Sequence, residues 1–119
     1  MRKRRPVLKV DSKVWIEDED GNYLFGYGIA SILEGIGRLG SISAVASERQ
    51  RSYRYIWGRI RKAEEILGTS LVETTLGGQD QRRSHLTSEG KRWLAGFLKV
   101  RNAVKKAATT YFDKHLADF

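Results

Sequence analysis

The chain has 119 residues, with 22 Lys and Arg against 14 Asp and Glu and a formal net charge of +8 at pH 7. This length suits one domain, because single domains cluster near ~100–150 residues. The surplus of positive charge is typical of proteins that bind a polyanion such as nucleic acid. The sequence has no Cys, which excludes disulfides, thiolate zinc sites and cysteine nucleophiles.

Residues 1–6 form a basic arm that we expect to be disordered, because its adjacent charges repel and offer nothing to bury. No apolar run follows the arm, and no stretch approaches the ~20 residues of a membrane span. We therefore expect a cytoplasmic, nucleoid-associated protein without a membrane partner, folded as one domain over residues 7–119.

Residues 7–25 are predicted to form a β-hairpin. β-Branched and aromatic residues lie on both sides of an acidic turn, in which the pair Asp20 and Gly21 is a hairpin signal. Strands are therefore expected near Val7 to Glu17 and Tyr23 to Phe25.

Three helices are predicted next, over residues 28–39, 43–49 and 52–67. In the first and third, apolar residues recur at helical spacing and a glycine, Gly40 or Gly68, follows the last turn. Ser43 is the expected N-cap of the short second helix, and Ser52 is that of the third.

Residues 71–87 are predicted to form a second hairpin, with strands at Leu71 to Thr75 and Ser84 to Thr87 around a loop with two adjacent glycines. A final helix is expected over residues 88–116, because apolar residues there follow a heptad-like spacing. The expected fold is mainly α with small β-hairpins: a winged helix-turn-helix with an N-terminal β-hairpin and a long C-terminal dimerisation helix.

This arrangement predicts DNA binding, because the second helix of a helix-turn-helix enters the major groove and a wing contacts the backbone or the minor groove. Cationic side chains crowd into the helix over 52–67 and the turn before it, whereas a merely solvated face normally mixes signs. The predicted DNA-binding residues are Arg49, Arg51, Ser52, Tyr53, Arg54, Trp57, Gly58, Arg61, Lys62, Gly77, Gly78, Arg82 and Arg83. Of these, Tyr53, Arg54 and Arg61 are the first choices for reading bases. Trp57 is ambiguous, because it neighbours the apolar stripe and could lie half in the core and half against the DNA backbone; packing in the core is favoured.

The last helix is predicted to pair with a second copy of the chain, because its apolar seam is longer than one domain needs for its own core. The seam residues are Trp93, Phe97, Val100, Val104, Ala107 and Tyr111. We expect no enzymatic activity and no metal or other cofactor, since His85 and His115 lie far apart in the sequence and no catalytic constellation is present.

Several short motifs follow one another over residues 13–98: Trp15-Ile16-Glu17, Leu24-Phe25-Gly26, Leu39-Gly40-Ser41-Ile42-Ser43-Ala44, Ser52-Tyr53-Arg54, Leu71-Val72-Glu73 and Leu86-Thr87-Ser88-Glu89-Gly90. In order and spacing they resemble the N-terminal DNA-binding domain of ModE-type molybdate-dependent regulators and, more distantly, the helix-turn-helix of LysR-type proteins. The resemblance implies a winged helix, action at a palindromic operator, and a dimer built from the first helix and the helix after the wing. Ile29 and Leu33 would then join the dimer interface.

The chain also departs from the ModE-type pattern. Arg49, Gln50 and Arg51 occupy the turn where the family has an apolar residue, a glycine and a second apolar residue. Nothing corresponds to the family's C-terminal oxyanion-binding domains, so we expect no small-molecule effector and no response to molybdate.

The expected function is a homodimeric transcriptional regulator that binds double-stranded DNA sequence-specifically. The alternative is a sequence-independent architectural or nucleoid-associated DNA-binding protein, which the positive charge would also suit.

Overall fold

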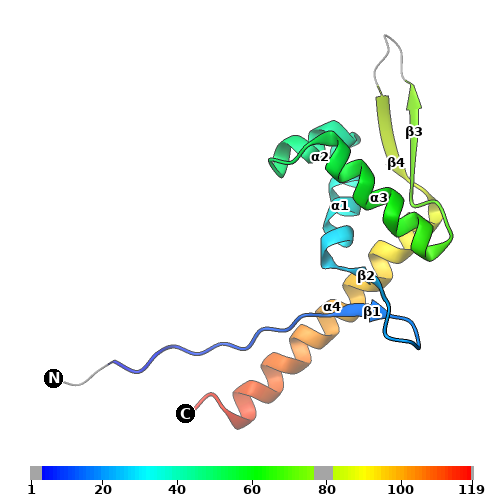
Figure 1. Cartoon of the computed structure of the whole chain (residues 1–119). Helices are drawn as coiled ribbons and strands as arrows, with labels where there is room; N and C mark the ends of the chain where they lie inside the picture. Colours follow the sequence, from blue (N-terminus) through cyan, green and yellow to red (C-terminus); the bar gives the residue numbers. More distant parts are fainter. Residues whose placement is uncertain (1–3, 77–81, 119) are drawn as a thin grey trace.

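The computed structural model describes residues 4–76 and 82–118 (Figure 1). Within these ranges the chain forms four helices and two antiparallel sheets of two strands each. The molecule is elongated, with principal extents of 66 × 39 × 20 Å. The elements are β1 (Trp15–Glu17), β2 (Tyr23–Gly26), α1 (Tyr27–Leu39), α2 (Ile42–Glu48), α3 (Tyr53–Leu67), β3 (Val72–Leu76), β4 (Arg82–Leu86) and α4 (Ser88–His115).

The hydrophobic core lies between α1, α2, α3 and the first half of α4. Leu33 of α1 and Ile56 of α3 are fully buried there. Phe25, at the end of β2, packs on Trp93 and Phe97 of α4, with both pairs of ring centroids 5.2 Å apart. The short strand β2 is therefore anchored by its aromatic side chain as well as by its pairing with β1.

The observed helix bounds all lie within one residue of the predicted ones. Gly40 and Gly68, with φ of 70° and 68°, end α1 and α3 in the left-handed conformation that glycine adopts readily. The side chain of Ser52 caps α3 by accepting a hydrogen bond from the amide of Tyr55 at 3.0 Å. The cap of α2 is Ser41 rather than the predicted Ser43, because Ile42 is already helical and buried in the core.

The N-terminal hairpin is shorter than predicted. Residues 7–14 have no regular secondary structure, because β2 passes directly into α1 after four residues and leaves no partner for a longer first strand. The turn is closed by Asp18, whose Oδ1 accepts hydrogen bonds from the amides of Asp20 and Asn22, both at 2.9 Å.

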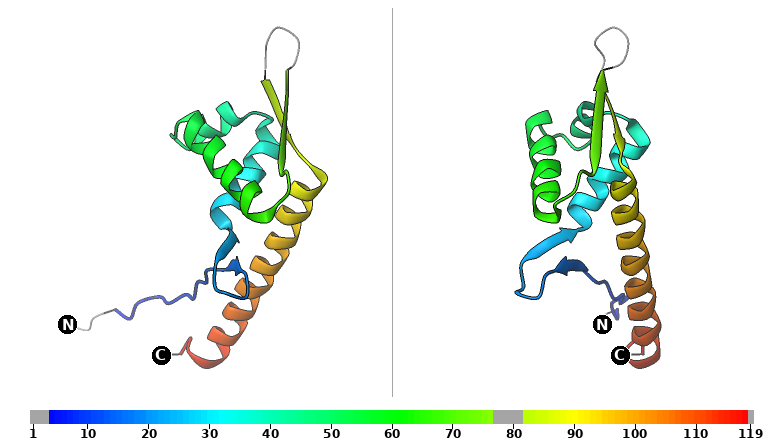
Figure 2. Two further views of the ribbon diagram at one scale, coloured as in Figure 1. Left: turned by 45° about the vertical axis from the view of Figure 1, so that its right-hand side comes forward. Right: turned by 90° about the vertical axis from the view of Figure 1, so that its right-hand side faces the viewer.

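The second hairpin is paired from Val72 with Leu86 to Leu76 with Arg82. It is attached to the body by the buried Ser84, whose amide donates to the carbonyl of Gly40 at 2.9 Å. From there it projects away from the core (Figures 1 and 2). The predicted strand start at Leu71 is one residue early, and Leu71 is a core residue.

Helix α4 begins after Thr87, whose hydroxyl accepts from the amide of Gly90 at 3.0 Å and donates to the carbonyl of Ser70 at 2.6 Å. Its first half packs on the core, and its second half extends beyond the other helices (Figure 2). In the described ranges no single helix is long and apolar enough to span a membrane; α1 and α2 meet that test only as a pair bent by 117°.

Candidate nucleic-acid interface

A tight turn joins α2 to α3. Its central residue, Gln50, has φ of 55°, in the left-handed region that β-carbons disfavour. The amide of Arg51 donates to the carbonyl of Ala46 at 2.9 Å, which closes the turn behind it. Gln50 thus takes the left-handed conformation at the position where the ModE-type pattern has a glycine. The turn therefore forms in this chain without a glycine.

Helix α3 has an inner and an outer face. Ile56, Ile60 and Ala63 face the core, as the helical spacing predicted. Arg54 and Arg61 are exposed on the opposite face, with Gly58 between them along the helix. The predicted recognition helix therefore presents its cationic side chains to solvent.

This outer face carries uncompensated positive charge. Between Arg49 and Lys62 there are six cationic residues and no acidic residue. Arg54 and Lys62 have no ion-pair partner in the part of the chain that the structure describes. Arg61 is the exception, because its Nη1 lies 3.7 Å from Oε1 of Glu64, two residues beyond the window.

The remaining cations of this window make local contacts that fix their direction. Arg49 donates to the hydroxyl of Ser31 on α1, and Nη1 of Arg59 donates to the phenol oxygen of Tyr55 at 3.2 Å. The hydrogen bond from Arg59, with the positive charges of Arg59 and Arg51, lowers the pKa of the Tyr55 hydroxyl. The electrostatic environment of α3 therefore favours negative charge, as a DNA phosphate would require.

Aromatic side chains also lie on the surface of α3. Trp57 is 46% exposed, so the favoured interpretation that it packs in the core was wrong. One residue after Ile56, it is turned about 100° away from the core-facing stripe. The guanidinium of Arg61 lies 5.7 Å from its ring centroid, and Tyr53, also exposed, begins the helix.

The β3–β4 hairpin places Arg82 and Arg83 at its outer end, where both are exposed. Gly77 and Gly78, predicted to contact DNA, lie outside the described residues. A residue that the sequence did not indicate connects the hairpin to α3: Oε2 of Glu64 accepts from the amides of Leu71 at 2.7 Å and Val72 at 3.2 Å. Pattern reasoning missed Glu64, because its partners are seven and eight residues away across a helix end.

The predicted dimerisation residues divide into two groups. Ile29, Leu33 and Phe97 are buried in the core of the single chain, so they pack within the fold instead of offering surface to a partner. The others lie along one side of α4, and we call them the α4 stripe: Trp93, Val100, Val104, Ala107 and Tyr111. Val100 is 47% exposed and Tyr111 is 62% exposed.

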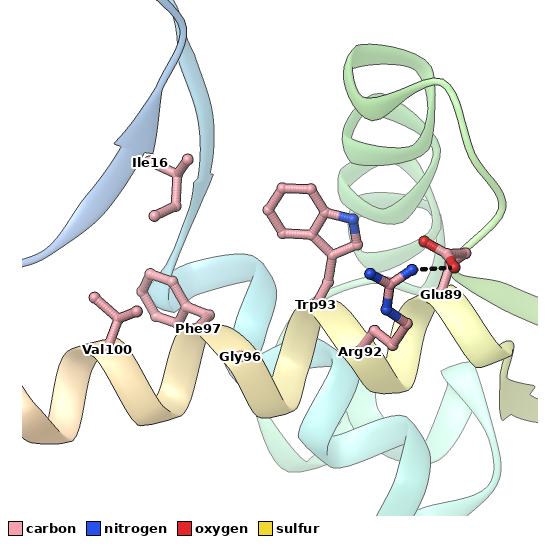
Figure 3. Close-up of a pocket in the computed structure, with 7 residues that line it drawn as sticks. All are labelled: Ile16, Glu89, Arg92, Trp93, Gly96, Phe97 and Val100. Carbon is pink, nitrogen blue, oxygen red and sulfur yellow. Dashed lines mark hydrogen bonds and ion pairs between the residues drawn. The ribbon is translucent and has the colours of Figure 1, made fainter.

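An apolar groove of about 450 Å³ opens beside the α4 stripe (Figure 3). Ile16 of β1 faces Phe97 and Val100 across it, and Trp93 forms part of its wall. An ion pair between Arg92 and Glu89, with N–O distance 2.9 Å, lies at its polar end. Sequence reasoning had not placed Ile16 here, because β1 lies more than seventy residues before α4.

Within residues 4–76 and 82–118, no group of three or more His, Asp or Glu side chains is placed to hold a metal ion. His85 instead pairs across the hairpin with Glu73, with Nε2 and Oε2 3.0 Å apart.

Comparison with known proteins gives a distant and partial similarity. No family model matches the chain. The molybdenum-pterin-binding protein MopB of Rhodobacter capsulatus is 31% identical over 86 residues, which cover 72% of this chain and 32% of that protein. The molybdenum-pterin-binding protein MopA of the same organism is 32% identical over 76 residues, 64% of this chain and 29% of that protein. The chain thus spans about a third of the length of these curated relatives.

Proposed function

We propose that this chain is a winged helix-turn-helix protein that regulates transcription by binding double-stranded DNA sequence-specifically as a homodimer. In this proposal α3 enters the major groove, and the β3–β4 hairpin is a wing whose Arg82 and Arg83 contact the backbone or the minor groove. The observation that carries it is the outer face of α3, where Arg54 and Arg61 flank Gly58 in a window with no acidic residue.

Gly58, in the middle of α3, supports the proposal that the outer face of this helix contacts DNA. A glycine inside a helix costs about 1 kcal/mol relative to alanine. Nothing lies within 4 Å of the position that a β-carbon at residue 58 would occupy, so packing inside the described chain does not require glycine there. A DNA backbone pressed against this face would require it, because glycine permits the closest approach.

The similarity to MopA and MopB is consistent with the ModE-type resemblance, since both connect the chain to molybdenum-related proteins. Our proposal assigns DNA binding to the region that this chain matches. It leaves the molybdenum-pterin binding, for which those two proteins are named, to the parts of them that this chain does not span.

The homodimer in this proposal uses the α4 stripe and the groove beside it. Exposed apolar side chains along one side of a long helix are typical of a helix that pairs with another. A charge in the stripe, Val104→Asp, is expected to give a monomer in light scattering. Thr109→Asp, a matched change on another side of α4, is expected to leave the dimer intact; a wild-type monomer at micromolar concentration would contradict the dimer.

The test of DNA binding is selection of bound fragments from random duplex DNA, followed by affinity measurements on the selected sequence. Arg54→Ala is expected to weaken binding by ~1–3 kcal/mol and to relax preference at one position per half-site, as loss of a bidentate base contact does. Lys106→Ala, an exposed cation on α4, is the matched control and should leave the preference unchanged.

The double change Arg82→Ala and Arg83→Ala is expected to weaken binding to all sequences about equally and to flatten its salt dependence. If the wild-type chain binds every duplex with equal affinity, sequence-specific regulation is excluded. The result would support the alternative function, a sequence-independent architectural DNA-binding protein.

A further inference from the structure

A second concave site lies at the N-terminal hairpin. It is a cleft of about 590 Å³ between the N-terminal segment (residues 11–14), the β1–β2 hairpin, the start of α1 and the second half of α4. None of its lining residues belongs to α2, α3 or the second hairpin. Its volume lies within the ~300–1,000 Å³ typical of small-ligand sites, so it fits a small molecule rather than a duplex.

Three aromatic side chains line this cleft and leave about half of their surface exposed. Trp15 is 48% exposed, and Tyr23 and Tyr27 are each 50% exposed. The phenol of Tyr23 lies over Gly26, where a β-carbon would overlap it. The cleft thus offers aromatic faces on which a planar ring can stack.

Three cations line the same cleft, against one carboxylate. They are Lys13, Arg101 and Lys105, and the carboxylate is that of Asp11. The guanidinium of Arg101 lies 4.0 Å from the ring centroid of Tyr27, which places a positive charge beside one of the aromatic faces. This combination favours a ligand with both an aromatic ring and negative charge.

Lys105 already holds a carboxylate at this position. Its Nζ lies 2.5 Å from Oδ1 of Asp11 and donates to the carbonyl of Ser12 at 3.2 Å. The Asp11 side chain is 73% exposed, so a competing anion from solvent can reach this ion pair. Beside it, the hydroxyl of Ser12 is buried and has no hydrogen-bond partner among the described residues, which leaves an unsatisfied polar group in the same wall.

We propose that this cleft binds a small planar aromatic anion, a ring that carries a carboxylate or a phosphate group. The ring packs against Trp15 and Tyr27, and the anionic group replaces the Asp11 carboxylate on Lys105. The sequence pattern had predicted no small-molecule site, because these residues come from three separate segments that only the fold brings together. The proposal is independent of the proposed DNA binding.

The test is a titration of the full chain followed by amide and indole N–H resonances, with indole-3-acetate and adenosine 5′-monophosphate as probes. Indole and inorganic phosphate, at matched ionic strength, separate ring stacking from simple charge. We expect at least one aromatic anion to give saturable shifts at the Trp15 indole and the Gly28 amide, with about tenfold weaker binding of both controls. Absence of saturable shifts, or equal binding of a control, overturns the proposal.

Variants test the residue assignment. Lys105→Gln is expected to weaken binding at least about tenfold, the loss that one charge-assisted hydrogen bond represents. Lys106→Gln, next to it but outside the cleft, should bind as the wild type does. Asp11→Asn should bind more tightly because it removes the competing carboxylate, a gain that misfolding cannot produce. A Lys105→Gln protein that binds like the wild type, or an Asp11→Asn protein that binds more weakly, overturns the assignment.

Discussion

The carbonyl group of Leu71 lies directly against the α-carbon of Gly90. A β-carbon on residue 90 would overlap the Leu71 oxygen and lie 3.1 Å from its carbonyl carbon. The same oxygen accepts the amide of Thr87 at 3.0 Å, and Leu71 is fully buried. In the Leu-Thr-x-x-Gly motif, Thr87 therefore caps α4, and Gly90 lets the first turn of that helix close onto the hairpin.

Gly90→Ala is accordingly expected to destabilise the fold. The atoms that would have to move are backbone atoms anchored in the core, so we expect the free energy of unfolding to fall by about 1–3 kcal/mol, as in other overpacked interiors. Urea denaturation at one protein concentration measures the change. Gly96→Ala, in the same helix but with open space around the new β-carbon, is the control and should raise stability by about 0.5–1 kcal/mol.

Gln50→Gly is expected to stabilise the chain. The left-handed conformation costs a non-glycine residue about 1–2 kcal/mol, and the greater chain entropy of glycine offsets part of the gain. We expect a net increase of about 0.5–1 kcal/mol in the free energy of unfolding, measured by the same denaturation. Gln50→Ala keeps the unfavourable φ and should change little; equal stabilisation by both changes would show that the side chain, not the conformation, is responsible.

Gly58→Ala separates stability from DNA binding. Because the new methyl group meets no atom of the described chain, the helix should gain about 0.5–1 kcal/mol in stability. If DNA approaches this face closely, the same methyl group should weaken operator binding by about tenfold, or 1.4 kcal/mol. Thermal denaturation and a fluorescence-anisotropy titration measure the two effects. A more stable protein with unchanged DNA affinity would mean that the middle of α3 does not touch DNA.

The attachment of the N-terminal segment should depend on pH. The hydrogen bond from Lys105 and, next, that from the Ser12 amide lower the pKa of the Asp11 carboxyl below its ordinary value of 3.8. The ionised Asp11 carboxylate stabilises the docked N-terminal segment at pH values above 3.8. This stabilisation is lost as the pH falls through the lowered pKa that Asp11 has in the folded chain. A pH titration of the carbon-13 shift of the Asp11 carboxyl should report the low pKa. The change Lys105→Gln should return this pKa toward 3.8, and Lys106→Gln should leave it unchanged.

Local signals predicted the helices and the second hairpin well, because each depends on neighbouring residues. Apolar spacing located α1 and α3, and Gly40, Ser52 and Gly68 marked their ends. The first strand was overextended, since its length depends on how soon β2 turns into α1, which alternation of residues along the chain does not reveal.

The candidate surfaces were predictable to different degrees. The cationic face of α3 follows from one continuous segment, so its residues could be identified from the sequence. Whether an apolar residue of α1 or α4 faces the core or the solvent depends on tertiary packing, which is why Ile29 and Leu33 were assigned to a surface that they do not reach. The cleft at Lys105 could not be predicted, because Asp11 and Lys105 are 94 residues apart.

The hydrogen bonds that the amides of Leu71 and Val72 donate to Glu64 have a consequence for engineering. The hairpin takes its orientation from a side chain on the flank of α3, and the start and end of that helix are set by Ser52 and Gly68. Since these three residues are distinct from the outward-facing Arg54, Gly58 and Arg61, those outward positions can be exchanged while the caps of α3 and the hydrogen bonds to the hairpin are kept. Libraries randomised at 54, 58 and 61 should therefore yield folded variants with new target preferences on an unaltered scaffold.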